Sequence, residues 1–369
     1  MEKDTPVKTI SVIPGDGIGI EVTQVALEIV ESLELDWELQ ICEGGWSSWL
    51  KYGSPIPEQT WSSIRSSDAL LLGATTSKPK REAMAELPPE LIKQAESYVS
   101  PIVQLRQKLD LYANVRPQLD ENFDTKLLVV RENTEGLYSG FDYSDLRENA
   151  VYSLVKSHRN VKEDPDGRIS GSIRLQTEFA MDRILNFACE TAKSKNISTV
   201  TVADKPNVLR ESSSVLRDCV DRASKKFPDV RISIENVDAV ALWMVRRPER
   251  FGLIVAENMF GDILSDLSAG LSGGLGVAPS ANYGENFAYF EPVHGSAPSR
   301  AGRGIANPTA MILSVALMAQ YLGYDHVSTV LRRALQATLL AGVSTYDQGG
   351  DATTKEFGKR VIKEVRGLR

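Results

Sequence analysis

Two aspartates four residues apart, Asp262 and Asp266, have the residue type and spacing of a possible metal-binding pair. They belong to the segment NMFGDILSD, and on a helix they would share one face. Like charges at this spacing repel each other by about 0.2–0.5 kcal/mol, and a hard divalent cation would remove that cost. A solvated acidic face is the alternative. The apolar residues around the pair indicate a half-buried helix, which favours a cation site.

Three arginines in separate segments could bind a substrate that carries carboxylates. Arg106 ends SPIVQLR, Arg116 lies in YANVRP and Arg131 begins RENTEGLY. An arginine fork binds a carboxylate with two parallel hydrogen bonds, so three arginines in an acidic protein could form a site for a dicarboxylate or tricarboxylate. Taken alone, the three residues are explained more simply as three surface salt bridges.

Two loops rich in glycine could approach a nucleotide. The segment PGDGIG (residues 14–19) lies between an expected strand and an expected helix, but its glycines are spaced as GxGxG, whereas a Rossmann loop needs GxGxxG. A tight turn between strand and helix is an equally open interpretation. The second loop, EPVHGSAP (residues 291–298), holds His294, one of three histidines. A histidine packed in a loop is the simpler interpretation of that residue alone.

The composition excludes several classes of protein. Of the 369 residues, 42% are hydrophobic and 25% are charged, as in globular proteins rather than disordered or collagen-like ones. The net charge of −7 argues against nucleic acid as a partner. No apolar run reaches the ~18 residues of a membrane span, and no signal peptide is visible. Three widely spaced cysteines favour a reducing compartment without disulfides or zinc, so we expect a cytoplasmic protein.

Short apolar strands alternate with amphipathic helices along the chain. Such alternation predicts an α/β architecture with much parallel sheet. The expected strands are residues 9–13, 69–73, 126–130, 199–202 and 253–256, and the expected helices include residues 21–33, 178–192 and 211–223.

Two further stretches predict a β-hairpin arm inserted into the α/β chain. Residues 150–159 and 167–177 look like strands, and EDPDG (residues 163–167) between them is a strong turn signal. An arm without a core of its own needs a partner surface, and a second subunit is the simplest source. Residues 271–276, with the sequence LSGGLG, predict a hinge.

Together these segments resemble the metal-dependent β-decarboxylating dehydrogenases of 2-hydroxy acids, which include isopropylmalate, homoisocitrate, isocitrate and tartrate dehydrogenases. The motifs LRxxLxLYANVRP, RENTEGLY and NxFGDILSD follow in order, and the resemblance runs from GDGIG to DQGGD at residues 347–351. It implies an isopropylmalate-dehydrogenase-like fold of two α/β domains, of a non-Rossmann type. The expected dinucleotide-binding domain comprises residues 1–111 and 273–369. Residues 112–272 would bind substrate and form the dimer, with the arm at about 139–177.

The resemblance also implies roles for the candidate catalytic residues. Arg106, Arg116 and Arg131 would bind the carboxylates of a malate-type substrate. Lys205 matches a catalytic lysine that reaches across a homodimer, and Tyr138 matches a proton donor. In this chemistry the metal acidifies the C2 hydroxyl and a hydride passes to the nicotinamide. Tyr138 then protonates the enolate that loss of CO₂ leaves behind.

The same resemblance implies metal, dinucleotide and dimer contacts. Asp262 and Asp266 of one subunit, with Asp238 of the other, would hold Mg²⁺ or Mn²⁺, and Asp238 would also contact the substrate. The active sites of a homodimer would therefore be shared between subunits, with a tetramer as a larger alternative. The expected dinucleotide contacts are Ile18, Thr75, Thr76, Asn207, His294, Gly295, Ser296, Ala297, Ser299, Arg300, Asn307 and Tyr346.

The substituent of the malate decides the substrate, and the expected helix start at Ser100-Pro101 bears on it. Ile102 and Val103 precede Arg106 by four and three residues, so they should face the same pocket. Isocitrate dehydrogenases carry Asn at the position of Ile102, where it can bind the extra carboxylate. Two aliphatic side chains favour 3-isopropylmalate, an intermediate of leucine biosynthesis. Because Ser100 is retained and the segment also resembles homoisocitrate dehydrogenases, homoisocitrate and isocitrate stay alternatives.

One loop position favours NADP over NAD. NAD-dependent relatives carry Asp directly after HGSAP, where it binds the ribose 2′-hydroxyl, whereas this chain has Ser299 and Arg300. Loss of the carboxylate removes repulsion toward a 2′-phosphate, and Arg300 could bind that phosphate. Tyr346 partly matches an NADP-type pattern, but Gly350 stands where some NADP enzymes have a further Arg. NAD therefore stays an alternative.

A non-catalytic regulatory subunit of an isocitrate dehydrogenase is the alternative from another class of protein. All eight proposed catalytic, metal and carboxylate-binding residues are present, which argues against it. Two departures from the family pattern remain. Pro206 follows Lys205 where relatives usually have Ala or Gly, and Gly252-Leu253 replaces the more usual Asp-Val before the strand that leads to the metal site.

Overall fold

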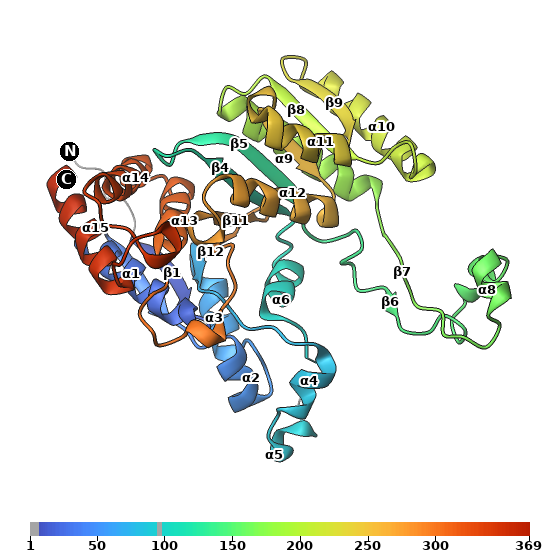
Figure 1. Ribbon diagram of the computed structural model, residues 1–369, viewed down its shortest axis with the longest axis horizontal. Coiled ribbons are helices and arrows are strands. Elements are labelled where there is room, and N and C mark those ends of the chain that lie inside the picture. The colour runs from blue at the N-terminus through green and yellow to red at the C-terminus, as the bar shows by residue number, and fades with distance from the viewer. Residues whose placement is uncertain (1–6, 94–97) are drawn as a thin grey trace.

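A single ten-stranded sheet, with helices packed against it, forms the body of the molecule in the computed structural model (Figure 1), which describes residues 7–93 and 98–369. Its strands are β1 (Lys8–Ile13), β2 (Trp37–Ile41), β3 (Ala69–Leu72), β4 (Ala113–Leu119), β5 (Thr125–Glu132), β8 (Thr199–Asp204), β9 (Arg231–Asn236), β10 (Leu253–Ala256), β11 (Pro279–Tyr283) and β12 (Ala288–Pro292). Their order in the sheet is β2-β1-β3-β12-β11-β4-β5-β10-β8-β9. The α/β class predicted from the sequence is confirmed.

The helices follow the strands much as the sequence predicts. They are α1 (Ile18–Ser32), α2 (Trp46–Tyr52), α3 (Glu58–Ser66), α4 (Lys80–Ala85), α5 (Pro89–Ile92), α6 (Pro101–Lys108), α9 (Glu178–Ser194), α10 (Arg210–Lys226), α11 (Val237–Arg246), α12 (Asn258–Leu271), α13 (Thr309–Tyr321), α14 (Asp325–Leu340) and α15 (Thr354–Leu368). Among the described residues there are also four short 3₁₀ helices, η1 (Pro248–Arg250), η2 (Leu275–Val277), η3 (Pro298–Arg300) and η4 (Tyr346–Gln348). In the described part of the chain, no helix is both long and apolar enough to cross a membrane.

The centre of the sheet is antiparallel, whereas both ends are parallel. β11 pairs antiparallel with β12 and β4, and β4 pairs antiparallel with β5. Toward one end β12, β3, β1 and β2 pair in parallel, and toward the other β5, β10, β8 and β9 do so. The predicted parallel sheet is therefore correct for the ends. The sequence does not predict β4 as a strand, because Asn114, Arg116 and Gln118 interrupt the apolar pattern of a buried strand.

Hydrophobic side chains form separate clusters at the two ends of the sheet. One cluster joins α1, α13, α14 and α15 to β1, β3 and β12, and it buries Phe290 and Phe357 completely or nearly so. Another joins α9 and α10 to β5, β8 and β10. The three cysteines are buried and unpaired. Each end has a core of its own, as the expected two domains would, and the proposed domain limits stay a prediction.

The arm projects far from the body (Figure 1), but its tip is helical. Its paired strands are only β6 (Asp142–Tyr143) and β7 (Gly171–Ser172), while α7 (Tyr152–Val155) and α8 (Arg159–Glu163) occupy the tip. The predicted strand at residues 150–159 is therefore wrong, and that at 167–177 shrinks to two residues. The apolar residues at the tip recur every three or four positions, which is the helical period, rather than every two.

Helix α6 begins where the sequence predicts, at Pro101 after Ser100. The Ser100 side chain, however, accepts no hydrogen bond from the helix, so it occupies the capping position without acting as a cap. The predicted helix around Asp262 and Asp266 is α12, and it ends at Leu271, where the glycine-rich stretch begins. The hinge proposed for that stretch stays a prediction.

The glycine turn after β1 requires glycine at position 17. Gly17 adopts a φ of +55°, in the left-handed region that side chains disfavour. A Cβ atom there would lie 2.2 Å from the carbonyl oxygen of Ser296. The next amide, that of Ile18, donates to the same oxygen at 2.9 Å. The turn therefore brings the start of α1 directly against the loop that follows β12.

Replacement of Gly17 by alanine should lower the free energy of unfolding by about 1–3 kcal/mol, because the side chain is strained and meets backbone. Gly367→Ala is the matched control, since Gly367 lies in α15 with open space around its Cβ position. Urea unfolding of both variants, followed by circular dichroism at one protein concentration, measures the difference. Equal losses in the two variants would contradict the close contact.

Candidate active site

Three arginines from three different elements converge beside α12. Arg106 comes from α6, Arg116 from β4 and Arg131 from β5. Arg116 and Arg131 both reach the carboxylate of Asp262, at 3.6 Å for the first of them. Burial, together with the positive charges of Arg106 and Arg116, lowers the pKa of Arg131 to about 9. Such crowding of cations favours the binding of an anion.

Two of the three arginines, Arg131 and Arg116, are each held in place by an asparagine side chain. Asn258 Oδ1 accepts hydrogen bonds from Arg131 Nε at 3.0 Å and Nη2 at 2.8 Å. Arg116 Nε donates to Asn114 Oδ1 at 2.9 Å. These two asparagines fix the planes of the guanidinium groups, which leaves part of each fork for other partners.

Arg106 is positioned differently, by residues of β12. Its Nε lies 3.3 Å from the hydroxyl of Tyr289, and its Nη2 lies 3.5 Å from Glu291. Tyr289 in turn donates to Glu291 at 3.0 Å. Sequence reasoning found the arginines but not these supporting residues, because β12 is distant in the chain and only the fold makes it a neighbour of α6.

The two aspartates and Tyr138 complete this group. Asp266 Oδ1 lies 2.7 Å from Arg116 Nη1, and Asp262 pairs with Arg131. The hydroxyl of Tyr138 donates to Asp262 Oδ2 at 3.1 Å. Burial, followed by the charge of Asp262, raises the pKa of Tyr138, which keeps the phenol protonated. The structure thus brings together five charged residues and one protonated hydroxyl that the sequence singled out.

Lys205 and Asp238 form a second, separate pair. Lys205 follows β8, Asp238 lies in the first turn of α11, and the two side chains are bonded to each other. The hydrogen bond from Lys205 lowers the pKa of Asp238. The side chain of Asp238 is 68% exposed. Within the described residues of one chain, no three carboxylate, histidine or cysteine side chains gather closely enough to hold a metal ion.

The carboxylates nevertheless suit a hard divalent cation. Asp262 and Asp266 lie on one face of α12, with side chains 30% and 54% exposed, so their oxygens can accept a cation from solvent. Within one chain they supply two ligand side chains. The third predicted ligand, Asp238, does not join them among the described residues of one chain, and its part in a metal site stays a prediction.

A cavity of about 510 Å³ collects most of the predicted dinucleotide contacts. Its lining includes Ile18, His294, Gly295, Ala297, Arg300, Asn307 and Tyr346. Burial lowers the pKa of His294, which favours the neutral form of its ring. The walls of the cavity come from the glycine turn before α1, the glycine-rich residues 273–276, the η3 loop and the η4 loop.

The remaining predicted dinucleotide residues lie outside that lining. Thr76 Oγ1 and Ser296 Oγ are hydrogen-bonded at 2.7 Å, and Thr75 beside them is buried. Ser299 lies in η3 next to the lining residue Arg300. Asn207 is an exposed residue of the Lys205 loop and is not part of the cavity. Their roles stay predictions.

Asp16, in the middle of the glycine turn, is a residue that sequence reasoning missed. Its carboxylate accepts three backbone N–H bonds, from Trp46 at 2.8 Å, Ser47 at 3.2 Å and Thr76 at 2.8 Å. It thus ties the turn to the start of α2 and to the loop after β3. An acidic residue between two glycines was the available signal, because such a turn leaves amides of neighbouring loops within reach.

The two residues expected to sense the substituent lie in different surroundings. Ile102 packs partly against the apolar cluster that contains Leu105, Leu111 and Tyr289. Val103, the next residue of α6, is 37% exposed. Val103 is therefore the freer of the two to meet a ligand, and the shared substrate pocket stays a prediction.

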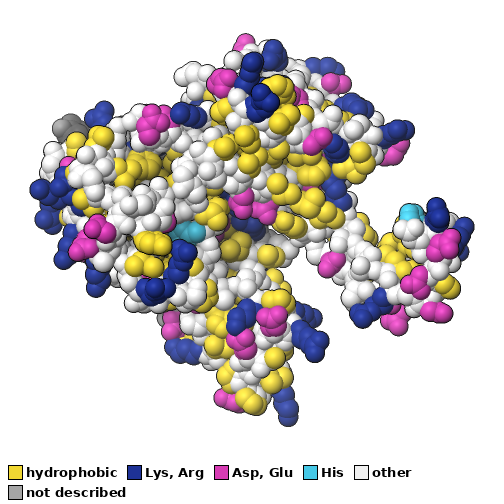
Figure 2. Space-filling view, in the orientation of Figure 1, with side chains coloured by type: hydrophobic (Ala, Val, Ile, Leu, Met, Phe, Trp, Pro, Cys, Tyr) yellow, Lys and Arg dark blue, Asp and Glu magenta, His cyan; other side chains and the backbone are white. Residues whose placement is uncertain are grey.

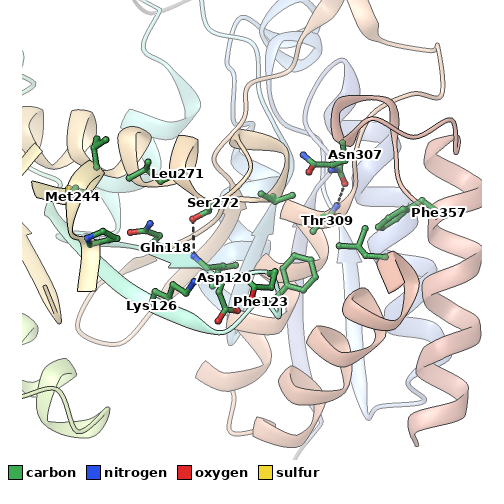
Figure 3. A pocket seen from close by; sticks show the side chains of 17 residues that line it. Gln118, Asp120, Phe123, Lys126, Met244, Leu271, Ser272, Asn307, Thr309 and Phe357 are labelled. Atoms are coloured by element: carbon green, nitrogen blue, oxygen red, sulfur yellow. Dashed lines mark hydrogen bonds between the residues drawn. The ribbon is translucent and has the colours of Figure 1, made fainter. Parts of the chain in front are cut away.

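A second cavity, of about 460 Å³, lies between β4, the ends of α11 and α12, and the C-terminal helices (Figure 3). Gln118, Met244 and Phe357 are among its labelled walls. It shares Asn307 with the first cavity. None of the clustered arginines, aspartates or Tyr138 lines it, so the candidate active site lies elsewhere.

Comparison with known proteins decides the family. Residues 9–361 match the model of the isocitrate/isopropylmalate dehydrogenase family. The chain belongs to this family. Protein DlpA of Legionella pneumophila is 46% identical across 100% of this chain, which spans 60% of that relative's length. A 3-isopropylmalate dehydrogenase of Archaeoglobus fulgidus and an isocitrate/homoisocitrate dehydrogenase of Thermus thermophilus are each 39% identical, over 96% and 97% of this chain and 98% and 99% of theirs.

A solved structure confirms the family fold. The isocitrate dehydrogenase of Methylococcus capsulatus superposes with a TM-score of 0.83 at 34% identity, over 97% of this chain and 99% of the other. The isopropylmalate-dehydrogenase-like fold expected from the motifs is therefore confirmed. Family membership supports the oxidative decarboxylation of a small hydroxy acid with NAD(P) and a divalent metal. Members are commonly dimeric.

Removal of Asn258 tests whether the arginine cluster binds substrate. Asn258→Ala should lower kcat/KM for a hydroxy acid by about 10- to 100-fold, because a hydrogen bond to a charged group contributes about 1.5–3 kcal/mol and Arg131 loses its support. Asn186→Ala is the control, since Asn186 bonds Lys226 and a backbone carbonyl in α9 instead. A loss of similar size in both variants would contradict the specific role.

Proposed function

We propose that this protein oxidatively decarboxylates a 3-substituted malate, with 3-isopropylmalate as the leading substrate and 2-oxo-4-methylpentanoate and CO₂ as products. The observation that carries this proposal is the pairing of Arg116 and Arg131 with the aspartates of α12, with the positive charge of Arg106 close enough to lower the pKa of Arg131. All 3-substituted malates share two carboxylates, and three arginine forks offer the complementary donors. The product would be an intermediate of leucine biosynthesis.

The residues of the site divide the reaction among them. The arginines bind and orient the two carboxylates of the malate core. Lys205 takes the proton of the C2 hydroxyl, while the C2 hydrogen leaves as hydride to the nicotinamide. The C3 carboxylate departs as CO₂, and Tyr138 donates a proton to C3. A bound Mg²⁺ or Mn²⁺, held by Asp262, Asp266 and Asp238, would supply Lewis-acid polarisation of the hydroxyl and keto oxygens.

Two copies of the chain would build each site. Asp238 and Lys205 are bonded to one another and do not join the aspartates of α12 in one chain. The helices that carry the three aspartates expose apolar side chains: Leu242 and Val245 of α11 are each 54% exposed, and Ile263 of α12 is 58% exposed. Figure 2 shows hydrophobic side chains gathered over this region. An apolar surface beside half a site fits a symmetric homodimer.

The aliphatic pair in α6 supports 3-isopropylmalate. Neither Ile102 nor Val103 can bind a third carboxylate, and Val103 is partly exposed. A methyl-sized difference in an apolar pocket contributes about 1–3 kcal/mol, enough for a preference between acids. The names of the relatives do not decide between these substrates, because a 3-isopropylmalate dehydrogenase and an isocitrate/homoisocitrate dehydrogenase are equally similar to this chain.

Homoisocitrate is the second candidate substrate, followed by isocitrate. Ile102 packs partly against the core cluster, so Val103 is the aliphatic side chain of the pair that is left to limit the size of the substituent. A longer acid could then be accommodated. A regulatory subunit is the less favoured alternative, because the three arginines, the aspartates and Tyr138 are all present, and all of them except Arg106 are bonded into one group.

We further propose NADP as the dinucleotide, with NAD as the alternative. Arg300 and Tyr346 line the cavity that holds most of the expected contacts. Ser299 precedes Arg300, so no carboxylate stands at that position to repel a 2′-phosphate. An arginine at the rim of the cavity could bind that phosphate.

A cytoplasmic location likewise stays a prediction.

A panel of three acids assayed with both dinucleotides tests the proposed function. With Mg²⁺ or Mn²⁺ present, kcat/KM should be higher for 3-isopropylmalate than for homoisocitrate or isocitrate, and higher with NADP than with NAD. Addition of EDTA should abolish turnover, and excess metal should restore it. A higher value for either rival acid would reassign the substrate, and no turnover with any acid would refute catalysis.

A further inference from the structure

Two buried carboxylates lie at the ends of neighbouring strands, each next in the chain to an element that bears candidate site residues. Asp204 is the last residue of β8 and Glu257 directly follows β10; these strands pair in parallel with Ala203 opposite Ala256. The side chain of Asp204 is 2% exposed and that of Glu257 is 4% exposed. Because an unpaired buried charge is costly, two carboxylates in adjacent positions need a positive partner.

Arg174 is that partner. It lies between β7 and α9, where the arm returns to the body. Its Nη2 is 3.5 Å from Asp204 Oδ1, and its Nε is 3.8 Å from Glu257 Oε1. Its Nη1 donates to Gln176 Oε1 at 3.0 Å and to Ser212 Oγ at 3.3 Å. Only 15% of the side chain is exposed, so the guanidinium is enclosed by these groups.

Each carboxylate is attached to an element that bears catalytic residues. Asp204 immediately precedes Lys205, and its second oxygen accepts a hydrogen bond from Ser213 of α10. Glu257 caps the N-terminus of α12, because its Oε1 accepts the N–H of Phe260 at 3.3 Å. The same helix carries both aspartates of the site. The guanidinium of Arg174 therefore contacts both the residue directly before Lys205 and the residue that caps α12. We call the segment that begins at Lys205 the lysine loop.

We propose that Arg174 is a positioning residue that couples two active sites. This inference rests on the proposed function, in which Lys205 serves the site of the neighbouring subunit and α12 serves the site of its own. The single positive charge of Arg174 pairs with Asp204, next to Lys205, and with Glu257, at the start of α12. Because Arg174 follows β7, it also links both segments to the arm. It contacts no substrate. A change at Arg174 should therefore disturb the alignment of catalytic groups more than the binding of the hydroxy acid.

The kinetic signature follows from that role. Arg174→Met removes the charge but keeps an extended side chain, and it should lower kcat by about 10- to 100-fold while KM for the hydroxy acid changes by less than about threefold. Arg174→Lys keeps the charge without the fork and should recover part of kcat. Arg183→Met is the matched control, since Arg183 is 18% exposed and pairs with Asp110. Its kcat should stay within about twofold of the wild type.

Amide hydrogen exchange separates positioning from a general loss of stability. In Arg174→Met, exchange should quicken by about threefold or more both in residues 203–213 and in residues 257–264, with α1 and α15 unchanged. An even increase over the whole chain, or an increase in one segment alone, would overturn the coupling. An unchanged kcat in folded Arg174→Met would overturn it as well. If Arg174→Met does not fold, the same two measurements on Arg174→Lys decide.

The two readouts also separate this inference from the proposed function. Hydrogen exchange needs no turnover, so it tests the link between the lysine loop and α12 even if the substrate is misassigned. A wild-type protein that oxidises none of the three acids refutes the proposed function, whereas unchanged exchange in both segments refutes the positioning role of Arg174.

Discussion

The crowding of three guanidinium groups against two carboxylates is the interaction on which the rest of the structure depends. Arg131 is buried beside Arg106 and Arg116, and its lowered pKa reflects the cost of that arrangement. Asp262 and Asp266 offset the cost within the chain. A substrate with carboxylates would replace them as partners of the arginines, and the freed aspartates could then bind a cation. Substrate and metal binding would thus favour each other.

The antiparallel centre of the sheet makes this crowding possible. β4 and β5 lie side by side with Asn114 opposite Arg131 in their register, so two of the arginines project from neighbouring strands. β12 supplies Glu291 and Tyr289 to the third arginine, and α12 packs against β5 with its aspartates toward the group. A Rossmann domain, whose sheet is mostly parallel, lacks the antiparallel centre that brings these strands together here.

Long motifs in the sequence carry the charged residues proposed for the site, and the structure brings five of them together, while their roles stay predictions. The sequence predicts α12 and α6 from helical spacing and capping residues, which are local signals. It fails for the arm, where apolar residues spaced three or four apart form short helices instead of strands. It also misses Asn258 and Asp16, because Arg131 and the amide of Thr76 lie far from them in the chain and only the fold brings them near. It misses Asn114 as well, although its partner Arg116 lies two residues away on the same strand.

Sharing of the site between subunits is tested most directly by mixing two inactive variants, Lys205→Met and Asp262→Asn. Each parent dimer lacks one essential group in both of its sites. In a mixed dimer one site loses both groups and the other keeps both, so random mixing should restore about one quarter of the wild-type activity. If mixed dimers form, as differently tagged subunits would show, and activity stays at the level of the parents, then each chain builds its own site and the shared centre is wrong.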